Sequence, residues 1–190
     1  ETITITNSST PEKTSLTVKK VWKDANDQDG KRAGVVAKVT LKKTVDGKTE
    51  DVETVSVTAE DDWKKEWTKL PVNEGGKSIK YSVVEVLETA NGYSSDTTEA
   101  VEVVNGGTIT ITNSYTPATR DITVTKAWVD GNNQDGNRPE SILVQLYANG
   151  EKVGEPVSLN AANGWEYTYE GLAQKANGAD IEYTVEELNV

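Results

Sequence analysis

Three polar side chains that could do chemistry together, Lys20, Glu85 and Asn113, lie in phase with apolar positions of predicted strands. Side chains two residues apart point to the same face of a strand. The in-phase sets are Leu16, Val18, Lys20 and Trp22; Tyr81, Val83 and Glu85; and Ile109, Ile111 and Asn113. Because an isolated buried charge is costly, an inward amine and an inward carboxyl must meet partners or become neutral. The plain interpretations are a buried ion pair capped by an amide, or polar residues at strand ends where the core face opens to water.

The same three residue types recur elsewhere in the chain, and this recurrence favours one shared site over the plain interpretations. Lys126, Glu187 and Asn7 occupy the corresponding positions of similar predicted strands. Their in-phase neighbours are Ile122, Val124 and Trp128; Tyr183 and Val185; and Ile3 and Ile5. One lysine, one glutamate and one asparagine are therefore expected to point inward in each complete copy.

An internal repeat explains this recurrence, and repeats of this kind decide the domain organisation of a chain. The matching pairs are 16–32 with 122–138, 61–70 with 163–172, and 79–86 with 181–188. We therefore expect four segments: a last strand of a preceding or complementing domain plus linker at 1–14, a complete domain at 15–115, a linker at 116–120, and a second domain lacking its final strands at 121–190.

The stretch TITITNS occurs at residues 2–8 and again at 108–114, whereas the second repeat stops before its own copy. In one interpretation the chain is a window from a longer array, and residues 1–7 are the tail of a preceding domain. In the other, these residues complete the second repeat of another chain, as donor strands do. Completion within one chain is disfavoured, because the roughly nine residues between Asn7 and Leu16 reach only about 30 Å.

The patterning predicts an all-β fold. Short alternating runs are separated by the turn signals DQDG, VDGK, NEGG and NGG. About seven strands in each repeat of roughly 100 residues predict a two-sheet antiparallel sandwich. The formal net charge of −11 argues against a nucleic-acid partner, and no apolar run is long enough to cross a membrane.

Composition also limits the chemistry. The chain has no His, Cys or Met, which removes thiolate nucleophiles, imidazole bases and the usual transition-metal ligands. We therefore expect no cofactor and no metal. The stretches 24–30 and 130–136 look like calcium loops, but Ala25 would fall at the first ligand position of the former, so hairpin turns are the better interpretation.

Four motifs, LTVKKVW, DQDGKR, IKYSVVEV and TITITNSY, resemble those of the collagen-adhesin B-type (Cna B-type) domains of Gram-positive surface adhesins and pilins. The resemblance covers nearly the whole chain and implies tandem reverse-immunoglobulin, prealbumin-like sandwiches. It also implies a spontaneous isopeptide bond between Lys20 and Asn113, promoted by Glu85. In the second repeat it implies Lys126 and Glu187, with no asparagine following in sequence. In the donor-strand interpretation above, Asn7 of another chain bonds to Lys126 with Glu187 assisting, and the contact propagates head to tail into a homo-oligomer.

This implied chemistry has a physical basis. Only a neutral amine attacks an amide, and burial among apolar side chains disfavours the charged forms of amine and carboxyl. A protonated carboxyl can polarise the amide and pass a proton to the leaving ammonia. The reaction runs once, so the chain is not expected to be an enzyme. The expected function is a self-crosslinked stalk module of an extracellular, cell-wall-anchored protein, with neighbouring repeats as partners; the alternatives are a host-matrix ligand-binding module and an engineered self-polymerising or ligation protein.

Overall fold

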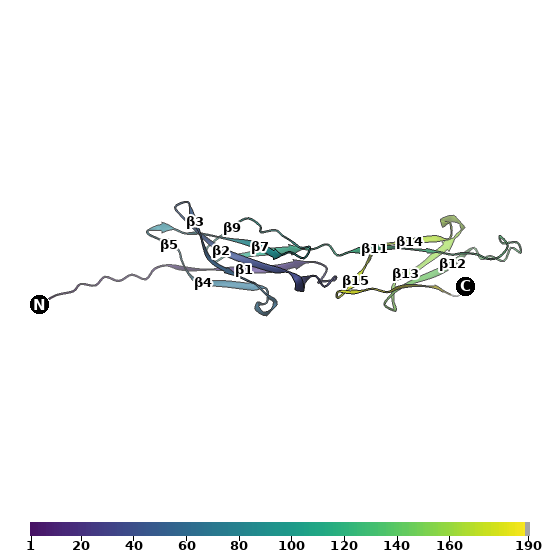
Figure 1. Cartoon of the computed structure of the whole chain (residues 1–190), viewed down its shortest axis with the longest axis horizontal. Coiled ribbons are helices and arrows are strands. Elements are labelled where there is room, and N and C mark those ends of the chain that lie inside the picture. The colour runs from purple at the N-terminus through teal and green to yellow at the C-terminus, as the bar shows by residue number, and fades with distance from the viewer. Residues whose placement is uncertain (189–190) are drawn as a thin grey trace. The chain divides into compact units, whose positions relative to one another are not determined.

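The computed structural model describes residues 1–188, and its regular structure is almost entirely β-strand (Figure 1). The chain divides into two compact units. Unit 1 comprises residues 1–26 and 31–115, and unit 2 comprises residues 27–30 and 116–190. In the part of the chain that the structure describes, regular helix is limited to three short 3₁₀ turns, η1 (Arg32–Gly34), η2 (Ala59–Asp61) and η3 (Ala161–Asn163). Within residues 1–188, no helix has the length and apolar character needed to span a bilayer.

Unit 1 is built from two four-stranded sheets. One sheet has the order β4-β1-β10-β8 and the other has the order β3-β2-β7-β9. The first contains β4 (Lys64–Pro71), β1 (Lys13–Lys23), β10 (Thr108–Ser114) and β8 (Ser94–Ser95). The second contains β3 (Lys48–Val55), β2 (Val36–Val45), β7 (Lys80–Thr89) and β9 (Val101–Val103). A short hairpin, β5 (Asn73–Glu74) and β6 (Lys77–Ser78), follows β4.

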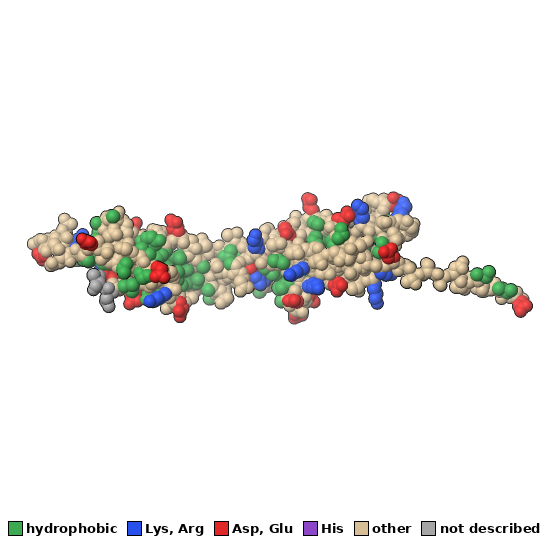
Figure 2. All heavy atoms as spheres, turned by 180° about the vertical axis from the view of Figure 1, so that it is seen from behind, with side chains coloured by type: hydrophobic (Ala, Val, Ile, Leu, Met, Phe, Trp, Pro, Cys, Tyr) green, Lys and Arg blue, Asp and Glu red, His purple; other side chains and the backbone are tan. Residues whose placement is uncertain are grey.

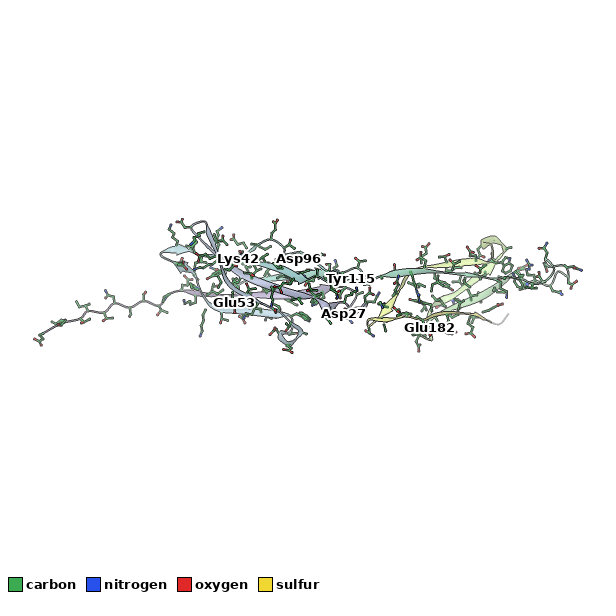
Figure 3. The ribbon with its side chains drawn as sticks, in the orientation of Figure 1. Asp27, Lys42, Glu53, Asp96, Tyr115 and Glu182 are labelled. Carbon is green, nitrogen blue, oxygen red and sulfur yellow. The ribbon has the colours of Figure 1, made fainter. Side chains whose placement is uncertain are left out.

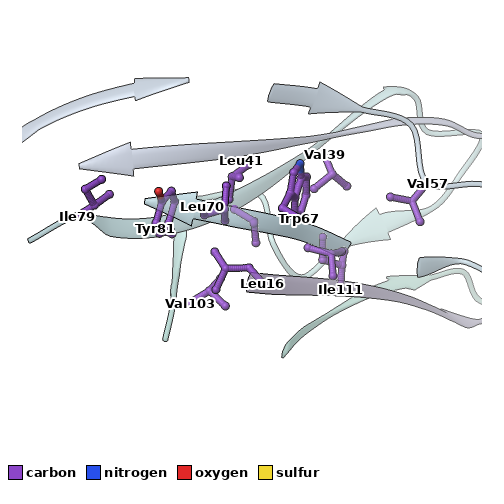
Figure 4. Close-up of a cluster of buried hydrophobic side chains, with 12 residues drawn as sticks. Leu16, Val39, Leu41, Val57, Trp67, Leu70, Ile79, Tyr81, Val103 and Ile111 are labelled. Carbon is purple, nitrogen blue, oxygen red and sulfur yellow. The ribbon is translucent and has the colours of Figure 1, made fainter. Parts of the chain in front are cut away.

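The core of unit 1 lies between these sheets, because alternate side chains of each strand face the opposite sheet (Figure 4). Leu16 and Val18 of β1 and Ile111 of β10 are at most 1% exposed. The facing side chains from the other sheet include Val39, Leu41, Tyr81 and Val83. Together with leucines such as Leu16 and Leu41, the β-branched and aromatic residues that predict strands fill this core.

The first and last strands of unit 1 lie side by side and run in the same direction. β1 and β10 pair in parallel, with Lys20 opposite Ile111 and Trp22 opposite Asn113. Among the strand pairs described in residues 1–188, this pair is the parallel one, and the others are antiparallel. The antiparallel pairing predicted from the sequence is therefore wrong for this pair, because a period of two is the same for parallel and antiparallel strands.

Unit 2 has a similar but more open set of strands. Its sheets are β11-β14, β13-β12-β17 and the short β15-β16 ribbon. The strands are β11 (Thr119–Thr125), β12 (Ser141–Ala148), β13 (Glu151–Asn160), β14 (Glu166–Ala173), β15 (Lys175–Ala176), β16 (Ala179–Asp180) and β17 (Tyr183–Leu188). The smaller core groups Ile142, Val144 and Leu159 with partly buried neighbours from β11 and β17.

The all-β, tandem-sandwich fold expected from the sequence is confirmed. The VDGK signal lies at the β2–β3 hairpin, where Asp46 and Gly47 have φ values of 52° and 81°, as two-residue hairpin turns require. The strands begin slightly earlier than the segments set out above. β1 starts at Lys13 and β11 at Thr119, because each continues its pairing toward the extended Thr-Pro segment before it.

Candidate functional site

The three in-phase polar residues of unit 1 meet in the core. Lys20 Nζ donates to Glu85 Oε1 over 2.6 Å, and Asn113 Nδ2 donates to Glu85 Oε2 over 2.5 Å. The residues come from β1, β7 and β10, so Glu85 reaches across from one sheet to an amine and an amide carried by neighbouring strands of the other. The carboxyl group therefore bridges the lysine amine and the asparagine amide.

This site is closed to water. Lys20, Glu85 and Asn113 are 3%, 1% and 0% exposed. Burial of such groups is tolerated only when they are paired and hydrogen-bonded, and the lysine and glutamate meet that condition through each other. The side-chain oxygen of Asn113 is buried without a hydrogen-bond partner. An acceptor left in this state is costly, and it is the atom of the amide that a donor would have to engage to polarise the carbonyl.

One tryptophan lies against the lysine amine, and a second packs on the first. Lys20 Nζ lies 4.7 Å from the ring centroid of Trp22, within the range of a cation–π contact. Trp63 packs edge-on against Trp22 with centroids 5.1 Å apart. A cavity of about 150 Å³ is lined by residues that include Lys20, Trp22 and Trp63. The amine is therefore shielded by aromatic rings but borders a small space.

The turn before β4 places Trp63. Thr58 and Asp61 form a reciprocal capping box around η2. Asp62 and Trp63 then adopt positive φ values of 52° and 54°, a conformation that is uncommon for a bulky residue. The reversed chain lets the Trp63 carbonyl accept a hydrogen bond from the Lys20 backbone amide over 2.7 Å. The strained turn thus fixes both the backbone of the lysine and the ring that packs against Trp22.

A segment that the sequence did not indicate holds Glu85 and Asn113 in place. Ser95 pairs with Asn113, and the Thr97 carbonyl accepts from the Glu85 backbone amide over 2.8 Å. Asp96, labelled in Figure 3, accepts from the Thr112 backbone amide and the Thr97 hydroxyl over 2.9 and 2.8 Å. Although partial burial works in the opposite direction, these hydrogen bonds hold the pKa of Asp96 below its usual value. Residues 95–97 thus tie β7 to β10 next to the site.

Unit 2 contains the same lysine–glutamate pair in a more open setting. Lys126 Nζ donates to Glu187 Oε2 over 2.8 Å and lies 4.7 Å from the Trp128 ring. The Lys126 amide also donates to the Trp165 carbonyl, and the Trp128 and Trp165 rings are 5.0 Å apart. The two charged side chains are 24% and 42% exposed, against 1% and 0% for Lys20 and Glu85. Asn7, the asparagine expected to complete this site from another chain, lies in the exposed N-terminal segment.

Each unit also contains an aspartate–arginine pair next to the tryptophan that contacts its lysine. Arg32 donates twice to Asp24, and Arg138 donates twice to Asp130, each with a shortest distance of 2.7 Å. In unit 2 the Arg138 hydrogen bonds lower the pKa of Asp130. Each guanidinium also lies over the tryptophan next to it in the fold. Within residues 1–188, no group of three or more acidic, cysteine or histidine residues could hold a metal ion, and the first aspartate of each calcium-like stretch, Asp24 or Asp130, is paired with an arginine.

Comparison with known proteins identifies the family of this chain. The family model for the Cna protein B-type domain matches residues 16–114 and 122–190. The chain is 45% identical, over 184 residues and 97% of its length, to a collagen adhesin of Staphylococcus aureus, and it spans about 14% of that protein. The chain therefore belongs to the Cna protein B-type domain family.

The solved structures that this chain is similar to include B repeat units and a pilus adhesin. A structure of two B repeat units of the collagen-binding protein of Staphylococcus aureus is 44% identical, with 95% of this chain and 44% of that chain covered and a TM-score of 0.40. A single B repeat unit from the same protein is 43% identical, with 94% and 87% covered and a TM-score of 0.39. A pilus adhesin of Lactobacillus rhamnosus GG is 18% identical, with 93% and 20% covered and a TM-score of 0.37.

Proposed function

We propose that the chain is a structural stalk module of an extracellular surface adhesin or pilin, and that a covalent bond between Lys20 and Asn113 locks its first unit. The single observation that carries this proposal is the buried bridge from Lys20 through Glu85 to Asn113, with distances of 2.6 and 2.5 Å. An ion pair between Lys20 and Glu85 does not require an asparagine at the other carboxyl oxygen. An amine, a proton carrier and an amide in one dry pocket are the complete set for amide exchange.

The reaction can be written from these contacts. A proton passes from Lys20 Nζ to the Glu85 carboxylate along their hydrogen bond, leaving a neutral amine and a protonated carboxyl. The amine attacks the Asn113 side-chain carbonyl carbon, and the new C–N bond forms as the carbonyl becomes tetrahedral. Glu85 then delivers its proton to the departing Asn113 nitrogen and takes one from the attacking nitrogen, so that ammonia leaves and an amide remains.

The surroundings supply the other requirements of this reaction. The fold holds nucleophile and electrophile on paired strands, which replaces a bimolecular encounter. The Asn113 side-chain oxygen has no partner before the reaction, and in a site without water a hydrogen bond from the protonated Glu85 carboxyl would stabilise the tetrahedral oxygen more strongly than in bulk water. The cavity beside Lys20 and its tryptophans has room for a molecule the size of ammonia. Glu85 ends with the proton that Lys20 gave up, and the amine and the amide are consumed, so the proposed reaction makes the chain a single-turnover crosslinker rather than an enzyme.

The proposed bond suits a stalk. The chain contains no cysteine, so a disulfide is not available to close the domain. A Lys20–Asn113 bond would enclose nearly all of unit 1 in one covalent loop. By the chain-entropy model used for disulfides, a loop of this length stabilises by roughly 4–5 kcal/mol, and reducing agents do not break an amide. Charged side chains of both signs are dispersed over the viewed face of each unit (Figure 2), as expected for a solvated spacer.

Peptide mapping tests the bond directly. After denaturation and tryptic digestion, we expect one branched peptide joining the segment that contains Lys20 to the segment that contains Asn113, with cleavage blocked after Lys20. Asn113→Ala should yield the two segments as separate linear peptides. Recovery of unmodified Lys20 and Asn113 peptides in full yield from the original chain would contradict the proposal.

Unit 2 is included in the proposal as an acceptor. Lys126 and Glu187 repeat two of the three groups, and an asparagine on a donated strand would complete the set. Residues 1–7 of another chain provide such a strand, with Asn7 at the position that corresponds to Asn113. The stalk proposal also includes anchoring of the protein in the cell wall and neighbouring repeats of the same array as its partners.

A second candidate function is binding of a host-matrix protein, favoured by the 45% identity to a protein named collagen adhesin. Immobilised collagen offered to the 190-residue chain separates the two candidates. The stalk proposal expects no saturable binding at micromolar concentrations, whereas a binding module gives a saturable isotherm that denatured chain cannot reproduce. An engineered ligation protein would share the crosslinking chemistry, and the tryptic peptide mapping described above would detect its crosslink.

A further inference from the structure

We infer that Asp96 is a positioning residue for the proposed crosslink, because one of its carboxylate oxygens joins the strand of Asn113 to the segment that holds Glu85. This inference rests on the proposed function and goes beyond it, since it makes the rate of the reaction depend on a residue outside the bridge. It is carried by three observations. The bridged groups lie on opposite sheets, a short segment crosses between the sheets beside them, and a single atom of Asp96 links the two sides of that crossing.

The bridge spans the space between the two sheets of unit 1. Asn113 lies on β10 of one sheet and Glu85 on β7 of the other, and their side chains meet over 2.5 Å. Backbone ladders hold the strands within a sheet, whereas facing sheets are held mainly by the packing of their side chains. A misplacement of a reacting group by about 1 Å can cost roughly a hundredfold in rate. The reaction therefore depends on how β7 and β10 are placed against each other.

Residues 94–97 cross from one sheet to the other next to the bridge. At the start of the crossing, Ser95 of β8 pairs with Asn113. Two residues later, the Thr97 carbonyl accepts a hydrogen bond from the Glu85 backbone amide over 2.8 Å, and Thr97 is only 3% exposed. The segment therefore contacts the backbone of both residues whose side chains meet in the bridge.

Asp96 joins the two sides of this crossing through one atom. Its Oδ1 accepts a hydrogen bond from the Thr112 backbone amide over 2.9 Å and another from the Thr97 hydroxyl over 2.8 Å. The Asp96 backbone amide also donates to the Thr112 carbonyl over 3.1 Å, so these two residues hold each other by two hydrogen bonds. Thr112 directly precedes Asn113. The carboxylate thus connects the neighbour of the electrophile to the residue that holds the backbone of the proton carrier.

A purely structural role for Asp96 is the alternative. The β8–β10 pairing covers Asn113 and Ser114, and the carboxylate gives the Thr112 amide, one residue earlier, the acceptor that every backbone N–H needs. The two roles differ in what they predict. Asp96 is an exposed residue, so its truncation leaves no core cavity and changes stability modestly. A structural role therefore predicts a slightly less stable fold that reacts at the original rate, whereas a positioning role predicts a much slower reaction.

Cell-free synthesis of the full chain allows the rate to be measured, because every molecule starts without the bond. After translation is stopped with an inhibitor, samples are denatured at intervals, and the intact mass gives the fraction that has lost one molecule of ammonia. We expect Asp96→Ala to react at least tenfold more slowly than the original chain. Asp96→Asn keeps an oxygen that accepts from Thr112 and Thr97, so it should recover at least a third of the original rate. Thr97→Val removes only the hydroxyl and should slow the reaction at least threefold.

Two controls separate positioning from loss of folding. Leu70→Ala truncates a core side chain of β4 that is 8% exposed and lies outside the bridge. It should destabilise unit 1 but keep at least half of the original rate. Each substitution is also combined with Glu85→Gln, which prevents the bond, so that the melting temperature reports the stability of the unreacted fold. In this background we expect Asp96→Ala to melt above Leu70→Ala, although it is the slower of the two in the reaction.

Three results would overturn the inference while leaving the proposed bond intact. These are an Asp96→Ala variant that loses ammonia as fast as the original chain, a slow Asp96→Ala variant that Asp96→Asn does not recover, and a Leu70→Ala variant that is equally slow. An original chain whose mass never falls would contradict the proposed bond itself, and the role of Asp96 would fall with it.

Discussion

Replacing Lys20 with alanine is expected to lower the melting temperature of unit 1 by roughly 15–30 °C, on the basis of a crosslink worth about 4–5 kcal/mol in a domain of this size. The covalent loop between β1 and β10 is lost, and so is the partner of the buried Glu85 carboxyl. An unpaired buried charge is itself strongly destabilising. Scanning calorimetry measures the shift, with the transition of unit 2 as an internal reference.

Further variants separate the bond from the ion pair. Asn113→Ala removes the electrophile but keeps Lys20 beside Glu85, and Glu85→Gln keeps the shape of the bridge but removes the proton carrier. Both should lower the melting temperature and leave a chain with no branched peptide. Lys19→Ala is the matched control, because Lys19 is an exposed lysine on the opposite face of the same strand. A Lys20→Ala variant that melts within about 3 °C of the Lys19→Ala variant would contradict the crosslink, since even one kcal/mol shifts such a domain by more than that.

When the chain is pulled by its two ends, we expect residues 21–112 not to extend. Force enters unit 1 through β1 and leaves through β10, and these strands are parallel neighbours, so the pull shears their ladder rather than opening it from one end. With Lys20 joined to Asn113, the force passes through the bond and bypasses the sequence between them. The hidden segment would otherwise lengthen the molecule by roughly 300 Å at about 3.3–3.6 Å per residue.

Single-molecule force spectroscopy measures this length. The original chain should show the extension of unit 2 without the roughly 300 Å step of unit 1, and Lys20→Ala should restore that step. Lys19→Ala should behave like the original chain. A full-length step in the original chain would show that force unfolds unit 1 without meeting a covalent link, and the stalk proposal would lose its mechanical basis.

The residues that meet at the site could be predicted from the sequence because they lie on long, regularly alternating strands. A period of two places Lys20 with Leu16 and Val18, and the 3% exposure of Lys20 agrees with that placement. The internal repeat added a second, independent copy of the pattern. The contact through Glu85 also needs the two sheets to face each other, which follows from the sandwich fold.

Other parts of the site left no such signal. Asp96 and Thr97 lie between the two-residue strand β8 and β9, where no alternation exists to predict a partner. Their hydrogen bonds to Thr112 and Glu85 join segments far apart in sequence, and only the folded chain specifies them. The positive φ of Trp63 was equally hidden, because bulky residues seldom adopt it.

The mass of the denatured, unreduced chain tests the central claim most directly. If Lys20 and Asn113 form their amide, the 190-residue chain weighs less than its sequence requires by one molecule of ammonia, and the Lys20→Ala, Glu85→Gln and Asn113→Ala variants each weigh what their sequences require. A wild-type mass equal to the full sequence mass, measured after complete folding, would contradict the account.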